Sequence, residues 1–302
     1  MMSEKKHRSF NVLGNIAIVN FSEKTLKSEK IKFAKEILKK NNSIKTVLEK
    51  SGNFKGRLRK MTTSWLAGEK TKEVLYKEND CVFRFNVDET YFSPRLSNER
   101  KEISSLIKDG EEVLVMFAGV APFPIVIARK THAKKVYSNE LNKKANKYAE
   151  LNIEKNAVKT KVILLPGDIK KVAEKIKKGW YLDKFSFHNP SKTIPQPPAH
   201  KKLFNKSNYK LNEIVSKKFD VIVMPRPQLK DSFLKQAFDL SKKGTRIYYY
   251  DFCRNDEINL IAEKIQNEAK HSKKKIKILK MKSAGELAPY KIRCRIDFKV
   301  LN

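Results

Sequence analysis

Small residues and two carboxylates follow three successive apolar segments of this sequence. The segment Val113–Phe117 runs into the small-residue stretch Phe117-Ala118-Gly119-Val120, and the next two apolar segments lead to Glu140 and Asp168. If these segments are parallel strands, the three features meet at the carboxyl edge of one sheet, where α/β proteins bind ligands. A loop of small residues lets the backbone approach such a ligand closely. Each carboxylate taken alone would more simply be a surface residue or a helix cap.

The order of these groups matches the parts of an adenosine cofactor. Glu140 is placed to accept both ribose hydroxyls, and Asp168 suits the exocyclic amine of adenine. The residues that follow them, Leu141 and Ile169, are expected to line the same site. A fourth segment ends in Met224-Pro225-Arg226-Pro227, whose prolines make a stiff wall at the reaction centre. The set favours S-adenosylmethionine, and the sequence has neither the Walker lysine of an NTPase nor the GxGxxG of a dinucleotide enzyme.

The elements that would position these residues alternate between strand and helix from residue 97 onward. Repeated βα units predict a mostly parallel sheet with helices on both faces. Two closing strands with a short connection predict an antiparallel edge, so the fold class is α/β, with a Rossmann-like methyltransferase sheet of seven strands, one of them reversed. The predicted strands are 113–117, 135–139, 162–165, 220–223, 245–251, 276–281 and 293–300, and the predicted helices are 143–156, 232–241 and 257–271, with one more ending at Thr131.

The first part of the chain, residues 1–96, has a different pattern and is predicted to be a small α+β domain that binds RNA and completes the active site. Residues 11–21 predict a strand pair around a Gly-Asn turn, and residues 73–87 predict a hairpin. Apolar residues at helical spacing predict a helix over 28–40, with lysines on its other face. Residues 97–302 then form the cofactor-binding domain.

The predicted cofactor domain contains a long polar insertion, residues 183–212, with four prolines. The region around it is rich in lysine and poor in acids. It is either a solvated loop without a role or an arm that follows a phosphate backbone.

The composition indicates a polyanionic partner. Among 302 residues, Lys and Arg number 66 against 33 Asp and Glu, a net charge of +33. Nucleic acid is the favoured partner and an anionic membrane surface the weaker one. No apolar run reaches the roughly 18 residues of a membrane span, and residues 1–9 lack a signal core, so a cytoplasmic location is expected. Cys81, Cys253 and Cys294 are far apart and are expected to be buried, without a metal site or disulfide.

One ten-residue segment is highly specific. Tyr91-Phe92-Ser93-Pro94-Arg95-Leu96-Ser97-Asn98-Glu99-Arg100 resembles the YFSPRL..ER signature of the archaeal and eukaryotic tRNA (guanine-37-N1)-methyltransferase family. The stretch from Met116 to Phe123 is similar to that family's MFAGVGPF, and Leu66-Ala67-Gly68-Glu69 and Gly56-x-x-Arg59 also fit. The resemblance runs from about Asn11 to the C-terminus. It implies an S-adenosylmethionine-dependent monomer that methylates N1 of the guanosine just 3′ of the anticodon, within the anticodon stem-loop. A further N-terminal domain, present in many members, is expected to be absent.

The resemblance also implies roles for single residues. Glu99 would be the general base that removes the N1 proton, and Arg59 would bind O6 and stabilise the charge that develops there. Tyr91 and Arg100 would lie against the cofactor. The target base would leave its stack to reach them.

Three positions depart from the family pattern. Val115 stands where many members have an acid, Ala121 replaces the second glycine of the loop, and Pro225 replaces the asparagine of an NLP or NPP motif. Relatives that make wybutosine share this fold and cofactor, so transfer of an aminocarboxypropyl group and methylation of a tricyclic precursor stay open. The three departures also leave open tRNA binding without catalysis. The dipeptide Pro122-Phe123 favours methyl transfer over aminocarboxypropyl transfer.

Overall fold

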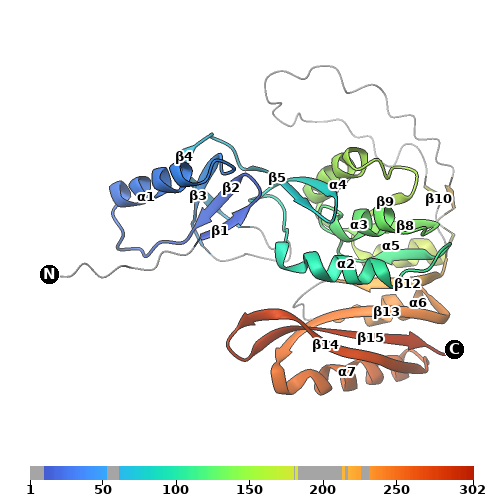
Figure 1. The fold of residues 1–302 in the computed structure, drawn as a ribbon. Coiled ribbons are helices and arrows are strands. Elements are labelled where there is room, and N and C mark those ends of the chain that lie inside the picture. Colours follow the sequence, from blue (N-terminus) through green and yellow to red (C-terminus); the bar gives the residue numbers. More distant parts are fainter. Residues whose placement is uncertain (1–9, 53–60, 180, 183–212, 215–216, 226–230) are drawn as a thin grey trace.

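The computed structural model describes residues 10–52, 61–179, 181–182, 213–214, 217–225 and 231–302. A small sheet with one helix lies on one side, and a large sheet covered by helices lies on the other (Figure 1). Arg59 and the insertion 183–212 lie outside the described residues. The strands on either side of the insertion, β10 (Tyr181–Leu182) and β11 (Glu213–Ile214), pair in antiparallel orientation.

The small sheet has four strands in the order β1-β2-β3-β4. Alternation along its strands sends Ala17, Val19 and Val47 toward helix α1 and turns Ile16 and Ile18 to the opposite face. The predicted strand pair and helix are confirmed, whereas β3 and β4 were not predicted. The elements are β1 (Phe10–Leu13), β2 (Ile16–Val19), α1 (Lys27–Lys40), β3 (Thr46–Lys50) and β4 (Thr63–Gly68).

The predicted hairpin, β5 (Glu73–Glu78) and β6 (Cys81–Asn86), joins the two sheets. On one side Asn15 Oδ1 accepts a hydrogen bond from the Leu75 amide at 2.8 Å. On the other side, two asparagines one turn apart pair with the edge of β6, one in helix α4 (Lys143–Lys155) and one at its C-terminal cap. Asn152 Oδ1 accepts from Arg84 N at 2.7 Å, and Asn156 Oδ1 accepts from Val82 N at 2.8 Å. The hairpin thus contacts both parts of the molecule. The domain boundary at residue 96 stays a prediction.

The large sheet has seven strands in the order β14-β15-β13-β12-β7-β8-β9. Strand β15 is antiparallel to both neighbours and the other six run in one direction, as predicted. The α/β fold class with a Rossmann-like sheet and a small N-terminal α+β part is therefore confirmed. The strands are β7 (Glu112–Val115), β8 (Lys135–Glu140), β9 (Val162–Pro166), β12 (Phe219–Met224), β13 (Ser241–Arg254), β14 (Ile276–Ala288) and β15 (Lys291–Val300).

Helices cover both faces of this sheet (Figure 1). Helices α2 (Ser97–Ser105), α3 (Pro122–Lys130) and α4 pack on the face that carries Val113, Val223 and Tyr250. Helices α5 (Ile169–Lys177), α6 (Leu234–Asp239) and α7 (Ile258–His271) pack on the face that carries Leu114, Ile222 and Tyr249. Two short 3₁₀ turns, Pro94–Leu96 and Asn255–Glu257, precede α2 and α7.

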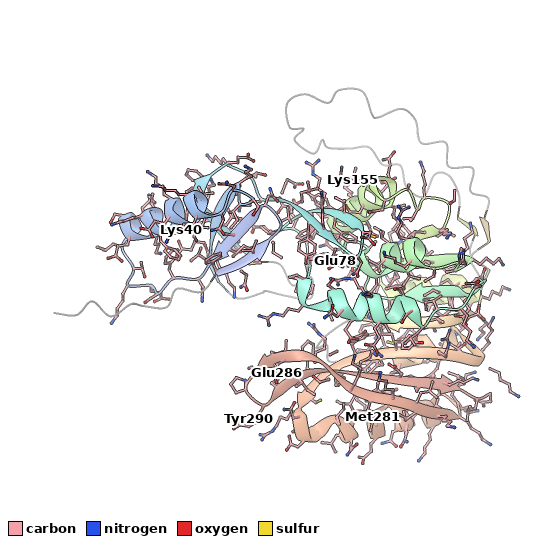
Figure 2. The ribbon with its side chains drawn as sticks, in the orientation of Figure 1. Lys40, Glu78, Lys155, Met281, Glu286 and Tyr290 are labelled. Carbon is pink, nitrogen blue, oxygen red and sulfur yellow. The ribbon has the colours of Figure 1, made fainter. Side chains whose placement is uncertain are left out.

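Several elements differ from the prediction in extent. Helix α5 was not predicted, α6 is shorter than the predicted 232–241, and β13 begins already at Ser241. Strands β14 and β15 form a long hairpin whose far end carries Glu286 and Tyr290 (Figure 2). The three cysteines are buried free thiols, as predicted. Among the described residues, no helix is long and apolar enough to cross a membrane.

Candidate active site

Hydrogen bonds tie together the ends of three neighbouring strands. At the end of β7, Ala118 N donates to Asn139 O at 2.8 Å and Gly119 N donates to Glu140 Oε2 at 2.8 Å. At the end of β9, the Asn139 side chain donates to Gly167 O at 3.0 Å. The small-residue loop, Glu140 and the residue before Asp168 are thus brought to one edge of the sheet, as the sequence predicted.

The loop after β7 turns tightly. Phe117, Gly119 and Ala121 all have left-handed backbone, with φ of 57°, 60° and 66°. The backbone of Tyr91 lies beside this loop, because a Cβ atom on Gly119 would be 3.4 Å from the Tyr91 carbonyl oxygen, an ordinary contact distance. Ala121 adopts a left-handed conformation that favours glycine, and this conformation costs an alanine about 1 kcal/mol. Within the loop, Ala118 and Val120 are buried.

The carboxylate of Glu140 is held in a fixed orientation. Its Oε2 accepts from Gly119 N at 2.8 Å, and its Oε1 accepts from Asn142 N at 2.7 Å. A carboxylate can accept more than one hydrogen bond at each oxygen, which is the chemistry that ribose hydroxyl groups require. Leu141 is half-buried beside it. This arrangement fits the ribose of an adenosine cofactor.

Asp168 caps helix α5, where its side chain accepts from Lys170 N at 3.0 Å. The simpler interpretation of this residue as a helix cap therefore holds. Ile169, the next residue, is buried. Asp168 and Glu140 end adjacent strands, so together they fit the adenine and ribose of one nucleoside.

The end of β12 forms the neighbouring wall. Met224 and Pro225 are both buried, and Met116 N donates to Val223 O at 2.9 Å, which ties this strand end to the loop after β7. The Phe117 ring packs edge-on against Phe233, with ring centroids 5.1 Å apart. Pro225 brings no amide hydrogen to this wall. Arg226 and Pro227 lie outside the described residues.

Glu99 lies in the first turn of α2 and is 5% exposed. Its Oε2 accepts from Arg295 Nη1 at 2.7 Å and from the Tyr250 hydroxyl at 2.8 Å, and its Oε1 accepts from Lys282 Nζ at 2.8 Å. Burial, followed by the charge of Glu99, raises the pKa of Tyr250 well above its usual value, so this phenol acts as a neutral donor. Three donors thus converge on the Glu99 carboxylate, which is the residue type that can accept a proton from a base.

Arg100, the next residue, is buried away from this group. Its guanidinium pairs through both Nε and Nη2 with the Glu78 carboxylate, the latter at 2.7 Å, and donates to Ser93 O at 3.0 Å. It also lies over the rings of Phe92 and Phe123. Figure 2 shows Glu78, the last residue of β5, near the centre of the molecule. The structure gives Arg100 the role of anchoring the Tyr91–Arg100 segment, and its contact with a cofactor stays a prediction.

The partners of Glu99 were missed by the sequence analysis. Tyr250, Lys282 and Arg295 come from β13, β14 and β15, which are far from Glu99 in the chain. One signal was available: Arg293, Arg295 and Asp297 alternate along a closing strand, which places three charged side chains on one face. Charged side chains on such a face must either be exposed to solvent or be paired with opposite charges. In the structure all three side chains are buried.

Two family models match the chain. Residues 74–182 match the TRM5/TYW2 methyltransferase domain, and residues 2–71 match the TYW2 N-terminal domain. The expectation that a further N-terminal domain is absent is therefore corrected, because β1–β4 and α1 lie within the second match. The small α+β part that the sequence predicted over residues 1–96 includes the residues that carry this N-terminal family sequence.

Curated relatives match nearly the whole chain. The tRNA (guanine(37)-N(1))/4-demethylwyosine(37)-methyltransferase Taw22 of Nanoarchaeum equitans is 33% identical over 97% of this chain and 100% of its own length. The tRNA (guanine(37)-N(1))-methyltransferase Trm5b of Pyrococcus abyssi is 29% identical over 97% of this chain and 74% of its own.

Solved structures agree with the fold. The crystal structure of Trm5b from Pyrococcus abyssi superposes with a TM-score of 0.75 at 28% identity, covering 97% of this chain and 75% of that one. TYW2 of Pyrococcus horikoshii, solved in complex with MeSAdo, superposes with a TM-score of 0.72 at 19% identity, over 97% of this chain and 90% of that one. With the strand-end carboxylates and the Tyr91–Arg100 segment in place, this chain belongs to the TRM5/TYW2 methyltransferase family.

Proposed function

We propose that this protein transfers a methyl group from S-adenosylmethionine to N1 of guanosine 37 in tRNA. The observation that carries the proposal is Glu99, a buried carboxylate in the first turn of α2 whose two oxygens are held by three donors. Support comes from the Nanoarchaeum equitans relative of matching length, whose name includes this reaction.

S-adenosylmethionine, the cofactor of this methyltransferase family, supplies an electrophilic methyl group when bound. Glu140 would hold its ribose and Asp168 its adenine, with the backbone of Phe117, Ala118, Gly119 and Val120 against the cofactor. Tyr91 lies within reach of this loop, because its carbonyl oxygen would be 3.4 Å from a Cβ on Gly119. Leu141, Ile169, Met224 and Pro225 would complete the walls.

The residues of the chain would then make guanine nucleophilic. N1 of guanine carries a proton at neutral pH, and its lone pair is released when a carboxylate removes that proton as the new bond forms. Glu99 is the proposed acceptor. Arg59, outside the described residues, would stabilise the negative charge that shifts to O6. The electron pair of the N1–H bond stays on nitrogen, and the proton moves to the carboxylate.

The test is methyl transfer from labelled S-adenosylmethionine to unmodified tRNA transcripts that carry guanosine or adenosine at position 37. The wild-type protein should label only the guanosine transcript, and Glu99→Gln should be slower by about 10²- to 10⁴-fold because it removes the base. The matched control is Glu263→Gln, an exposed glutamate on α7 at the opposite face of the sheet, which should retain activity. Equal labelling of the guanosine and adenosine transcripts would rule out guanosine 37 as the target, but it would not contradict membership of the methyltransferase family.

A second candidate reaction is methylation of 4-demethylwyosine at the same position. The name of the Nanoarchaeum equitans relative motivates it, because that name includes both substrates. Offering the protein tRNA that carries this tricyclic base should give a product heavier by one methyl group. A mass increase matching an aminocarboxypropyl group would instead assign the chain to the other wybutosine-pathway reaction, and binding without any product would assign it to the inactive class.

A further inference from the structure

A buried guanidinium connects three carboxylates beneath α2. Arg295 on β15 is fully buried, and it donates to Glu99 Oε2 at 2.7 Å, to Glu102 Oε1 at 2.7 Å and to Asp297 Oδ1 at 2.8 Å. Its planar fork with five donors suits such a multiple contact in a way that lysine does not. Among the described residues, the other charged or titratable groups near this cluster include Lys280 and Lys282 on β14 and Tyr248 and Tyr250 on β13. Arg246 on β13 donates to the Tyr248 hydroxyl at 3.3 Å, and Arg293 lies on the same face of β15.

The two oxygens of Glu99 are held differently. Oε2 accepts from Arg295 and Tyr250, whose side chains are buried in the core. Within the described part of the chain, Oε1 accepts from Lys282, whose side chain is 26% exposed. Lys282 is also bonded to Glu102 Oε2 at 2.5 Å. Loss of its contact with Glu99 would therefore leave Lys282 paired, without the cost of a stranded buried charge.

We propose that Arg295 and Tyr250 are positioning residues that anchor Oε2 of Glu99, so that Oε1 is the oxygen that takes the proton and Lys282 is the group that the target base displaces. The proposal rests on the proposed function of Glu99. The N1–H bond breaks, its electron pair stays on N1 for the bond to the methyl carbon, and the proton passes to Oε1. Oε2 keeps its two core donors throughout, so the carboxylate does not rotate as it is protonated.

The cluster is suited to the change of charge at Glu99. Burial tends to raise the pKa of Glu102, but hydrogen bonds from Arg295 and Lys282 outweigh it and hold this pKa at about 2. Glu102 therefore stays ionised over the working range of pH. When Glu99 becomes neutral, Arg295 still has Asp297 and Glu102 as partners, and Lys282 still has Glu102.

A substitution that removes a single hydroxyl tests the proposal. Tyr250→Phe deletes the donor to Oε2 and keeps the packed ring. The matched control is Tyr249→Phe, one residue earlier, whose hydroxyl donates to Asp251 at 2.9 Å on the opposite face of the sheet. Single-turnover methyl transfer to a guanosine-37 transcript should be followed from acidic to basic pH, together with the KM for tRNA, the Kd for S-adenosylmethionine and the Tm.

For Tyr250→Phe we expect a rate lower by about tenfold, the loss typical of one hydrogen bond to a charged group. The acidic limb of its pH–rate profile should move to higher pH, because losing a donor favours the protonated carboxylic acid. KM for tRNA and Kd for S-adenosylmethionine should not change, and Tyr249→Phe should match wild type. Arg295→Lys, which keeps the charge and loses the fork, should move the same limb in the same direction.

A purely structural cluster would lower the Tm and leave the acidic limb unmoved. Wild-type pH profiles for both Tyr250→Phe and Arg295→Lys would therefore overturn the proposal, even if either variant is less stable. Failure of the proposed function is distinguishable, since it would appear as an active Glu99→Gln variant or as wild-type protein without guanosine-37 activity.

Discussion

At the scale of single residues, adjacent positions of one short motif contact different parts of the structure. Glu99 and Arg100 are neighbours in the chain, yet Glu99 lies against β13 and β15 while Arg100 points to the hairpin and pairs with Glu78. Helical geometry explains the separation, because consecutive residues are about 100° apart around the helix axis. A motif conveys which residue types are present, whereas the direction of each side chain depends on what packs against the helix.

The Arg100–Glu78 pair gives a test at this scale. Both side chains are almost fully buried, so Arg100→Met should leave the Glu78 carboxylate uncompensated and lower the free energy of unfolding by about 3–5 kcal/mol. Urea denaturation measures this loss. Asp80→Asn, which removes one partner of the exposed Lys130–Asp80 pair, is the control and should change little. If Arg100→Met unfolds like wild type but binds S-adenosylmethionine weakly, Arg100 serves the cofactor instead.

At the scale of elements, the β5–β6 hairpin connects the small sheet to the large one. Val74, Phe83 and Phe85 from the hairpin share one apolar core with residues of both sheets. The close approach of the turn at Gly14 to β5 makes this junction possible, since a Cβ on Gly14 would lie 2.0 Å from the Leu75 carbonyl oxygen. The relative placement of the two sheets therefore depends on a residue without a side chain.

Replacing that glycine tests the junction. Gly14 and Gly110 both have left-handed backbone, with φ of 54° and 75°, but a Cβ on Gly110 would meet nothing within 4 Å. Gly110→Ala should therefore cost only the backbone strain of about 1 kcal/mol. Gly14→Ala should cost clearly more and should lower the Tm further, because the backbone of β5 must move. Equal losses in thermal unfolding would mean that the contact between turn and hairpin is unimportant.

At the scale of the whole molecule, the dominant feature is charge. With a net charge of +33, the positive side chains on the surface repel one another and attract polyanions. Affinity for tRNA should therefore fall steeply as salt is added, because each phosphate contact releases counterions. The polar insertion 183–212 is the segment that the sequence analysis proposed as an additional phosphate-binding arm.

Deleting residues 183–212 tests that hypothesis. Strands β10 and β11 pair in antiparallel register, with Leu182 opposite Glu213, so a two-residue Asn-Gly turn can join the ends. The shortened protein should show a higher KM for tRNA and a shallower dependence of log Kd on log salt concentration. Kd for S-adenosylmethionine is the internal control and should not change. An unchanged salt slope would exclude the insertion from phosphate binding.

The sequence alone was sufficient for features that are encoded locally. Strand and helix periodicity predicted the order of the α/β elements, and the Gly14-Asn15 turn predicted the first strand pair. The residues at the strand ends were predicted to lie along one edge of the sheet, where the structure places them, because parallel strands bring their carboxyl ends to the same edge. Their contact with a cofactor stays a prediction. Helix α5 was not predicted, although Ile169, Val172, Ala173 and Ile176 have helical spacing, because its lysines continue into the basic region that follows.

Only the tertiary structure decided which distant residues meet. The donors that hold Glu99 lie 151, 183 and 196 positions away in the chain, on three different strands. The order of these strands within the sheet cannot be predicted from any local sequence pattern. The same holds for Arg100, whose partner Glu78 belongs to the preceding hairpin. Burial also depends on this packing: a charged residue such as Arg295 is stable in the core only because the fold supplies three carboxylates around it. Periodicity specifies elements, while the pairing of buried charges is settled when the elements assemble.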